Sequence, residues 1–444
     1  MEKFKKLSKQ KKIALAVGSV ACVAALAAGI TFIVVNSNQT SEVKPVVTSS
    51  DFDNSSESTL TLSDGQNKIN KGGTYYVTGS TSNGYIIINT SENVKLILDN
   101  VSIARSDGSP VHIKGGASVL IEFIGDNTLT STETGDDPSA AISSQGSVTI
   151  SGSGSATLKS NGKGIKADGE LLIENGKLDI SAVDDAVHSN TNVAISGGEI
   201  TATSSDDGVH ADETVTISGG KLNVTKSYEG IEGTNITVSG GEVSLVSSDD
   251  GFNVSGGNDQ SGGNGGPMQG GGAMDADSGG VLTISGGNVY VNAAGDGLDS
   301  NGSIIISGGT VYVDGPTDNG NGALDYNGKM EISGGTLIAV GSSGMAQNAT
   351  SASQPSVLIN LTSSYKDSFT FGEITYSPKK SYSSILISSD KLKTGASYDL
   401  KISGNTVQTV AVSQNVTTSG SASGTPGNMP VRAQGTQYSD SRRR

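Results

Sequence analysis

Three consecutive stretches of the chain repeat one pattern: VAISGGEITATSSDDGVHADET (residues 193–214), VTISGGKLNVTKSYEGIEGTN (215–235) and ITVSGGEVSLVSSDDGFNVS (236–255). The isoleucine or valine before Ser-Gly-Gly recurs at Ile195, Ile217, Val238, Ile284, Ile306 and Ile332. The steps between these positions are 22, 21, 46, 22 and 26 residues. A fixed period near 22 residues is typical of a solenoid, in which each repeat buries its apolar face only against its neighbours.

Within the repeat of residues 215–235, apolar residues alternate with polar ones in three short runs, which predicts strands. The side chains expected to point inward are Val215, Ile217, Leu222, Val224 and Ile231. Gly219 and Gly220 lie between the first two runs, where a sharp corner needs a positive φ that glycine adopts at low cost. Three strands and three corners per repeat predict one coil of a parallel β-helix, with equivalent residues stacked about 4.8 Å apart.

The composition favours a single elongated all-β protein. The chain has 444 residues, 62 glycines, no tryptophan and only 16% charged residues. Its formal charge of −15 argues against nucleic acid as a partner, because the phosphates would be repelled, and favours cations. The single cysteine, Cys22, gives no evidence for or against disulfides.

The N-terminus predicts a membrane anchor. Residues 1–12 carry six lysines and form a basic cytoplasmic segment, and residues 13–35 contain no charge. At about 1.5 Å per residue, this second run is long enough to cross a bilayer as a transmembrane helix. The lysines would leave the N-terminus in the cytoplasm and the remaining chain outside the cell. The alternative is a cleaved signal peptide and a secreted protein, since the Ala-Leu-Ala sequence at 25–27 resembles a cleavage site.

The rest of the chain divides into five expected parts. Residues 36–58 are rich in Ser, Thr and Asn and predict a flexible linker, and residues 59–345 predict the β-helix. A glycine-rich insert at 255–280 accounts for the 46-residue step and predicts a mobile loop. Residues 356–412 lose the period and predict a small antiparallel β cap, followed by a disordered tail at 413–444.

Acidic residues recur after the second strand of successive coils, so stacking would turn them into ladders. One expected ladder contains Asp185, Asp207, Glu229 and Asp250, and a second beside it contains His188, His210, Glu232 and Asn253. Two carboxylates about 4.8 Å apart repel by about 3.5 kcal/mol at an effective dielectric constant of about 20. A bound cation would offset this repulsion, and oxygen ligands on a stiff scaffold favour Ca²⁺ over zinc. The predicted calcium ligands are Asp184, Asp185, Asp206, Asp207, Glu229, Glu232, Asp249, Asp250, Asp296 and Asp299.

The alternative for the whole ladder is a set of solvated turn residues with protonated or lysine-paired members. Outside the ladder, the residues predicted to contact a sugar are Lys163, Lys166, His188, His210, Tyr290 and Tyr312. The lysines precede the ladder by one coil and suit an anionic sugar, a lyase base or an ordinary surface. The histidines would hydrogen-bond either a sugar or the neighbouring coil. The tyrosines share one outward position in successive coils and form either a sugar-stacking platform or a packing contact.

Residues 59–412 resemble a known family through the repeated DDGVH and ISGG motifs and the C-terminal stretch YSPKKSYSSILISS. The family comprises bacterial extracellular carbohydrate-binding β-helix proteins of cellulolytic clostridia. This resemblance implies a right-handed parallel β-helix, similar in shape to polysaccharide lyase family 9, with calcium binding and an association with polygalacturonate and cellulose. Calcium binding would carry over onto Asp184, Asp185, Asp206, Asp207, Asp249 and Asp250. Glu229 replaces aspartate in the middle coil and interrupts this row of matching positions.

The sequence therefore predicts a monomeric, membrane-tethered cell-surface protein that binds acidic polysaccharide through calcium on the stacked carboxylates. One alternative is a calcium-dependent lyase in which Lys163 or Lys166 removes the α-proton of a uronate. Another is a surface spacer or adhesin whose calcium only stiffens the coils. No acid–base pair stands out, so no catalytic residue is predicted and binding is favoured over turnover.

Overall fold

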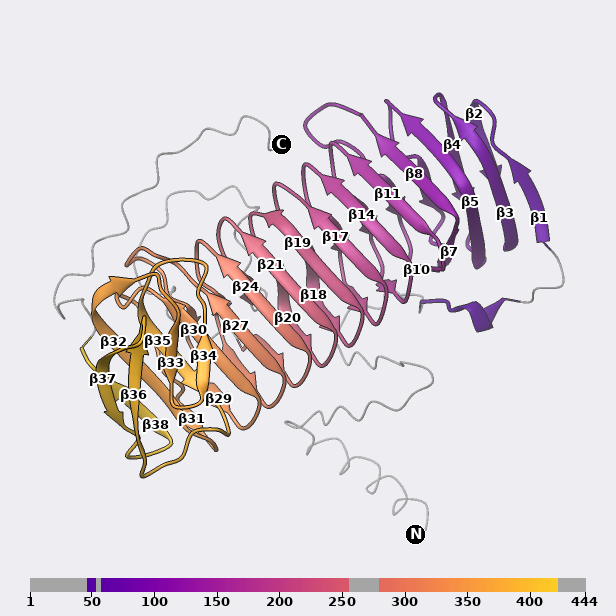
Figure 1. The fold of residues 1–444 in the computed structure, drawn as a ribbon. Helices are drawn as coiled ribbons and strands as arrows, with labels where there is room; N and C mark the ends of the chain where they lie inside the picture. The colour runs from indigo at the N-terminus through magenta and orange to yellow at the C-terminus, as the bar shows by residue number, and fades with distance from the viewer. Residues whose placement is uncertain (1–45, 53–56, 255–278, 422–444) are drawn as a thin grey trace, which may run out of the picture. The chain divides into compact units, whose positions relative to one another are not determined.

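The computed structural model describes residues 46–52, 57–254 and 279–421 (Figure 1). Within these ranges the chain forms strands and one short 3-10 helix, η1 (Ser49–Asp51). No helix in the described ranges is long and apolar enough to span a bilayer. Several predicted segments lie wholly or largely outside the described residues: the basic segment 1–12, the membrane span 13–35, the insert at 255–280 and the tail at 413–444. The described start of the predicted disordered tail, however, contains a strand, β38 (Val416–Ser419).

Each coil contributes strands to three parallel ladders, which stack side by side in Figure 1. The first ladder contains β1 (Glu57–Thr61), β3 (Gly73–Thr81), β5 (Val94–Arg105), β7 (Val119–Ile124), β10 (Val148–Gly152), β13 (Leu171–Ile173), β16 (Asn192–Ile195), β18 (Val209–Ile217), β20 (Ile231–Val238), β23 (Val281–Ile284), β26 (Ser303–Ile306), β29 (Met330–Ile332) and β31 (Ser351–Ala352).

The second ladder begins with the ends of β3 and β5 and continues through β8 (Asp126–Ser131), β11 (Ser155–Ser160), β14 (Lys177–Ala182), β17 (Glu199–Thr203), β19 (Lys221–Ser227), β21 (Glu242–Ser247), β24 (Asn288–Ala293), β27 (Thr310–Asp314) and β30 (Thr336–Gly341). The third contains β2 (Gly65–Ile69), β4 (Gly84–Asn89), β6 (Val111–Lys114), β9 (Ile142–Ser144), β12 (Ile165–Ala167), β15 (Val187–Ser189), the starts of β18 and β20, β22 (Phe252–Val254), β25 (Leu298–Ser300) and β28 (Leu324–Tyr326).

The register of the first ladder matches the sequence period. The paired residues are Ile195 with Ile217, Ile217 with Val238, Val238 with Ile284, Ile284 with Ile306, and Ile306 with Ile332. Because Val238 pairs directly with Ile284, the 46-residue step advances the stack by one coil, as the other steps do, and adds no extra coil. The predicted all-β solenoid, a parallel β-helix of the right-handed type, is confirmed.

The interior of the coils is a continuous apolar core. All five side chains predicted to point inward in the repeat 215–235 are at most 1% exposed: Val215, Ile217, Leu222, Val224 and Ile231. Each contacts its equivalents in neighbouring coils within one cluster. Burial of such a side chain stabilises the fold by about 1.5–3 kcal/mol, so stacking rather than any single coil supplies the stability.

The two glycines of the first corner have different roles. Gly220 has a φ of 74°, in the left-handed region that favours glycine. The backbone of Gly219 passes so close to the preceding coil that a Cβ atom there would lie 2.4 Å from the carbonyl oxygen of Ser196. The sequence predicts three corners per coil, but β18 and β20 each run through the third corner as one strand. In β18 a register shift between Ala211 and Thr214 accommodates the bend.

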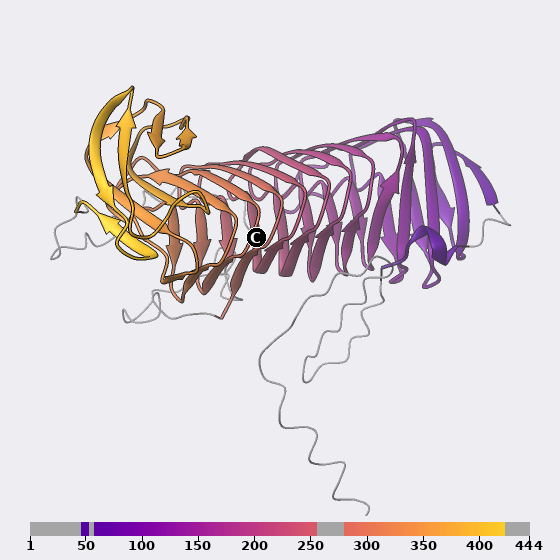
Figure 2. The same ribbon diagram turned by 60° about the horizontal axis from the view of Figure 1, so that its bottom comes forward.

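The C-terminal strands pair differently from the coils. The solenoid sheet continues through β32 (Ser356–Tyr365), β35 (Tyr382–Ser388) and β38 (Val416–Ser419), and β35 pairs antiparallel with β30 and β32. A separate antiparallel sheet contains β33 (Phe369–Phe371), β34 (Ile374–Tyr376), β36 (Ser397–Ile402) and β37 (Asn405–Ala411). These strands share a second apolar core and lie at the end of the coils in Figure 2.

A short part of the expected linker packs on the solenoid. Val47 is 4% exposed, and its carbonyl accepts a hydrogen bond of 2.7 Å from the hydroxyl of the buried Thr149 on β10. The chain therefore contacts the outside of the first ladder before β1 begins.

Candidate functional site

A column of acidic turn residues runs along one edge of the solenoid, where the second ladder turns into the third. It contains Asp185, Asp207, Glu229, Asp250 and Asp296. The backbones in this column are in register: Gly208 N donates to Glu229 O at 3.0 Å, and Gly230 N donates to Asp250 O at 2.9 Å. The structure therefore brings together carboxylates that are far apart in the sequence.

A second column lies beside it on the third ladder. Its members, each paired with the next, are Lys166, His188, His210, Glu232, Asn253, Asp299 and Asp325. These side chains face outward, because their neighbours within each strand, such as Val187 and Ser189 in β15, are buried. The column changes from basic through mixed to acidic along the stack, so its two ends differ chemically.

The N-terminal part of the site carries its own cations, and we call it the paired segment: Lys163, Asp184, Asp185, His188, Asp207, His210 and Glu232. Lys163 Nζ lies 3.0 Å from a carboxylate oxygen of Asp184 and 2.5 Å from one of Asp185. Asp185 is 3% exposed, yet its pKa is lowered, because the hydrogen bond from His188 and the charge of Lys163 outweigh its burial. This lysine neutralises the position where the sequence predicts calcium.

The two histidines of the paired segment interact with the protein through both ring nitrogens. Their rings stack with centroids 4.9 Å apart. His188 places Nδ1 2.8 Å from Asp185 and Nε2 2.9 Å from Asn190. His210 places Nδ1 3.0 Å from Asp207 and Nε2 3.4 Å from Asp212. These contacts leave neither ring free to recognise a sugar in this arrangement.

His210 is a second internal cation of the paired segment. Burial lowers its pKa, but the hydrogen bonds with Asp207 and Glu232 outweigh this effect and raise the value to about 11. Glu232 lies 3.3 Å from His210 Nδ1. Burial and the charges of Asp185 and Glu232 also raise the pKa of its partner Asp207. We place the proton that the two residues share on His210, because Asp185, Asp207 and Glu232 all act on this one ring.

Glu229 separates the paired segment from the acidic coils that follow. It is 7% exposed and accepts a hydrogen bond of 2.7 Å from Asn253 Nδ2. Burial and the charges of Glu232 and Asp207 raise the pKa of Glu229 to about 10, so it is neutral at pH 7. The aspartate column therefore changes residue type at this coil, where the carboxyl group is bonded to the amide of Asn253.

The C-terminal part of the site is different, and we call it the acidic segment: Asp249, Asp250, Asp296, Asp299 and Asp325. Asp296, Asp299 and Asp325 each place a carboxylate oxygen within 4.8 Å of the others. Burial, followed by mutual repulsion, raises the pKa of Asp250 to about 9, of Asp299 to about 8 and of Asp296 to about 7. Within the described residues, no lysine, arginine or histidine forms an ion pair with any of these last three.

The backbone holds two carboxylates of the acidic segment in place. Asp296 N donates to Asp250 Oδ1 at 2.6 Å, and Gly322 N donates to Asp296 Oδ1 at 2.5 Å. Each aspartate therefore bonds the next coil through one oxygen, which orients the carboxylate on a rigid turn. Such fixed oxygen donors suit a hard cation.

The other residues predicted to contact a sugar are Lys166, at the basic end of the second column, and two tyrosines outside both columns. Lys166 is 39% exposed and lies 3.8 Å from Asp168. Tyr290 and Tyr312 are paired in neighbouring strands, as their shared outward position predicts. The ring of Tyr312, however, stacks on Tyr376 of β34 at a centroid distance of 5.2 Å. The C-terminal strands cover this face of the platform.

Asp314 explains the position of these tyrosines, and nothing in the repeat pattern indicates its role. It is fully buried and accepts hydrogen bonds of 2.9 Å from the hydroxyls of Tyr290 and Tyr376, and of 3.0 Å from the Lys379 amide. This cluster attaches the C-terminal sheet to the coils. Asp325 differs from Asp314 in this respect, because it lies in the second column, whose positions the repeat period predicts.

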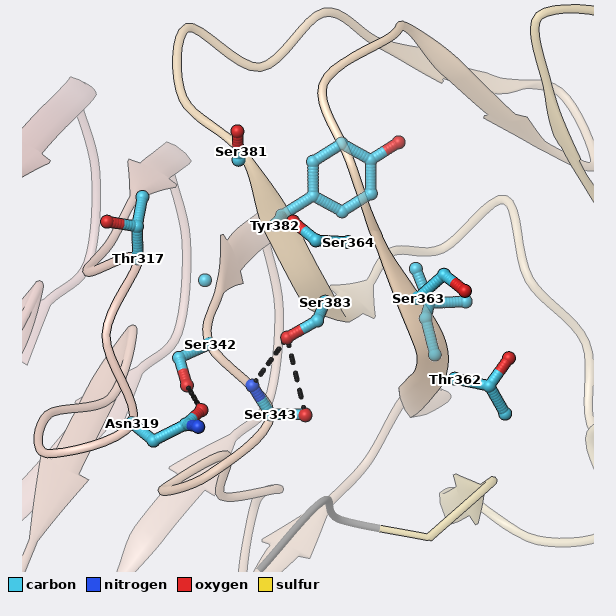
Figure 3. Close-up of a pocket in the computed structure, with 12 residues that line it drawn as sticks. Thr317, Asn319, Ser342, Ser343, Thr362, Ser363, Ser364, Ser381, Tyr382 and Ser383 are labelled. Carbon is cyan, nitrogen blue, oxygen red and sulfur yellow. Dashed lines mark hydrogen bonds between the residues drawn. The ribbon is translucent and has the colours of Figure 1, made fainter.

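A neutral pocket of about 270 Å³ lies between the last coils and the C-terminal strands (Figure 3). Its lining is rich in hydroxyl groups. Ser343 N donates to Ser383 Oγ at 2.9 Å, and Ser342 Oγ donates to Asn319 Oδ1 at 2.5 Å. The lining residues carry no charge, so the pocket suits sugar hydroxyls better than a carboxylate.

A family of known proteins matches more than half of the chain. The model of a family described as carbohydrate-binding domain-containing protein matches residues 63–319. A protein of that description from Acetivibrio thermocellus is 28% identical over 135 residues, which cover 28% of this chain and 47% of the relative. The chain thus spans about half the length of this relative. A solved structure described as a polysaccharide lyase-like protein from C. thermocellum covers 62% of this chain and 95% of its own, with 22% identity and a TM-score of 0.34.

Proposed function

The chain belongs to the family of carbohydrate-binding domain-containing proteins, and on that premise we propose that it binds acidic polysaccharide through calcium held by the acidic segment. The proposal keeps the function predicted from the sequence and moves the ion. Calcium occupies the coils that contain Asp250, Asp296 and Asp299, and the paired segment uses Lys163 and His210 in its place.

The observation that carries this proposal is the uneven distribution of cations along the columns. In the paired segment, Lys163 lies within 3.0 Å of two carboxylates, and His210 is protonated. In the acidic segment, burial and then the charges of neighbouring carboxylates raise the pKa values of Asp250, Asp299 and Asp296, and within the described residues no cation forms an ion pair with these three. Two charges about 4.8 Å apart repel by about 3.5 kcal/mol at an effective dielectric constant of about 20, and a divalent cation removes this cost.

Calcium suits these donors, because it takes six to eight oxygen ligands and tolerates irregular geometry. Asp250, Asp296, Asp299 and Asp325 would hold the ion. A uronate carboxylate is a further oxygen donor, so the bound ion would link the anionic protein edge to an anionic polymer that the edge alone would repel. A neutral polymer would gain nothing from this bridge.

The test is retention of the purified chain on immobilised polygalacturonate in calcium and in excess chelator. We expect calcium-dependent retention that Asp296→Asn and Asp299→Asn each reduce at least about tenfold, because each substitution removes a charged ligand. Asp184→Asn is the matched control, since Lys163 already neutralises that position. Loss of retention in Asp184→Asn, with Asp296→Asn unaffected, would place the ion in the paired segment.

The alternatives from the sequence make different predictions in the same experiment. A calcium-stiffened spacer or adhesin would gain melting temperature with calcium and show no retention. A lyase would release unsaturated product and needs a neutral lysine beside the ion. Although burial lowers the pKa of Lys163, Asp185 and Asp184 raise it above its ordinary value, so Lys163 stays protonated. Burial lowers the pKa of Lys380 to about 8 against the opposing charges of Asp314 and Asp318, and Lys380 Nζ donates a hydrogen bond to the carbonyl oxygen of Ala293.

Placement at the cell surface is part of the same proposal. Calcium is present at millimolar concentration outside cells. It would therefore occupy sites whose affinity is too low for the calcium concentration of the cytoplasm. The uncharged run at 13–35 would tether the solenoid to the membrane, or be removed if the protein is secreted. Protease treatment of intact cells would degrade a surface-exposed solenoid and leave an internal one intact.

A further inference from the structure

Tyr228 occupies an unusual position on the edge that carries the candidate site. In equivalent turns of other coils the residue is Asp184, Asp206 or Asp249. The backbone confirms the equivalence: Tyr228 N donates to Asp206 O at 2.8 Å, and Asp249 N donates to Tyr228 O at 2.9 Å. An aromatic ring therefore replaces a carboxylate at the boundary between the paired and acidic segments.

The ring of Tyr228 is exposed although the turn that carries it is ordered. Its side chain is 45% exposed, whereas Glu229 beside it is 7% exposed. Within the described residues, the ring stacks on no other aromatic side chain, unlike Tyr312, which the C-terminal strands cover. A single exposed ring is common on protein surfaces. Tyr228 differs from such rings because it occupies a turn position that is aspartate in neighbouring coils.

The phenol of Tyr228 lies beside Asp249 of the acidic segment. Interaction with the Asp249 carboxylate, followed by burial, raises the pKa of the Tyr228 phenol above its ordinary value. Asp250, the first carboxylate of the acidic segment with a strongly raised pKa, lies one coil away, about 4.8 Å along the solenoid.

We propose that Tyr228 is a sugar-stacking residue of this edge: the apolar C–H face of a pyranose ring stacks on its exposed ring while the carboxylate of the same polymer reaches the ion of the acidic segment. The inference rests on the proposed function and deepens it. It also transfers the stacking role from Tyr290 and Tyr312 to a residue that the repeat pattern places in the site. Stacking recognises the sugar ring, and the ion recognises its charge.

The test is the affinity of the full chain for oligogalacturonate in calcium, measured by isothermal titration. Tyr228→Ala is expected to weaken binding roughly 2- to 12-fold, the range of an aromatic stacking contact. Tyr228→Phe keeps the ring and should retain affinity within about twofold of the unaltered chain. The matched control is Tyr85→Ala, because that ring lies under the guanidinium of Arg105 at 3.6 Å, away from the acidic segment. Melting temperatures of the variants verify folding.

A tryptophan variant supplies a direct readout, because the natural chain has no tryptophan. In Tyr228→Trp, emission should shift on addition of oligogalacturonate with calcium and stay constant with calcium alone. If the chain retains polygalacturonate in calcium, but Tyr228→Ala binds as well as the unaltered chain and the tryptophan emission does not change, the stacking role is wrong and the proposed function stands. If the unaltered chain shows no calcium-dependent retention, the proposed function fails first.

Discussion

At the residue scale, Lys163 acts as a cation built into the site. It lies 3.0 Å from Asp184 and 2.5 Å from Asp185, which is 3% exposed. We predict that Lys163→Met lowers the free energy of unfolding by about 3–5 kcal/mol, because a buried carboxylate loses its partner. Calcium should restore part of this loss, since Asp184, Asp185 and Asp206 place oxygens within 4.8 Å of one another. Urea unfolding in calcium and in chelator measures both effects.

The control is Lys166→Met, which removes an exposed lysine 3.8 Å from Asp168 and should change stability by less than about 1 kcal/mol. Equal losses in the two variants, or a Lys163→Met protein that calcium does not stabilise more than the unaltered chain, would contradict the role of Lys163 as a substitute for calcium.

His210 predicts a pH dependence of stability. Its pKa is about 11 in the folded chain against an ordinary value of 6.5. Because the folded state binds this proton more tightly, the stabilisation is complete below about pH 6.5 and is lost as the pH rises toward 11. The unfolding free energy in urea should therefore fall between pH 7 and pH 10.

His210→Gln should flatten that slope, because the group that releases the proton is gone. His112→Gln serves as the control: burial, with the charges of Lys114 and Arg105, lowers the pKa of His112, so it titrates below 6.5 and leaves the alkaline slope intact. An unchanged slope in His210→Gln would mean that the proton lies elsewhere in the paired segment.

At the element scale, three corner glycines distinguish two physical requirements: a positive φ and the close approach of a neighbouring coil. Gly65 has a φ of 79° and open space around a Cβ, Gly219 has only a clash with Ser196 O at 2.4 Å, and Gly220 has both a φ of 74° and a Cβ 2.5 Å from Gly197 O. We predict that Gly65→Ala costs about 1–2 kcal/mol, the strain of the left-handed region alone. Gly220→Ala should cost more than Gly65→Ala, and Gly219→Ala should also be destabilising.

Thermal unfolding of the three variants tests this order. A Gly219→Ala protein as stable as the unaltered chain would show that adjacent coils separate easily at the corner. Gly65→Ala and Gly220→Ala proteins of equal stability would show that the close approach between coils adds nothing to the conformational strain.

The strands and corners also show which features of the fold the sequence predicts. The Ile-Ser-Gly-Gly period predicts the coils and the register, because a solenoid core requires equivalent residues to stack. It does not predict that β18 continues through the third corner, since a bulge there absorbs the bend without any glycine or proline. The covering of Tyr312 by Tyr376 depends on a contact between distant parts of the chain, which no local period encodes.

The backbone register of the candidate site was predictable from the sequence, but the partners of its side chains were not. Stacking indicates that Asp185, Asp207 and Asp250 share an edge, and they do. The sequence does not say which carboxylates receive an internal cation, because that depends on the direction in which Lys163 and His210 point. Side-chain partners, rather than the carboxylate column itself, divide the edge into two chemically different segments.

At the scale of the whole solenoid, the acidic segment lies on both sides of the insert in the chain. Asp250 precedes the insert and Asp296 follows it, and β22 pairs with β25 across it, with Phe252 opposite Leu298. An ion held by both coils would stabilise this junction by adding ligands from each side. Because each coil contacts only its neighbours, that stabilisation should stay local.

We therefore predict that calcium slows amide hydrogen exchange in β22, β25 and β28 and leaves β12 and β15 unchanged relative to chelator. Binding to the folded state alone stabilises it by about 2.7 kcal/mol at a hundredfold excess over the dissociation constant, which corresponds to about a hundredfold slower exchange where opening releases the ion. Exchange followed by mass spectrometry resolves the two groups of strands. Equal protection of both groups would mean that calcium stiffens the coils generally, as a spacer requires, whereas protection confined to β12 and β15 would return the ion to the segment that Lys163 and His210 already neutralise.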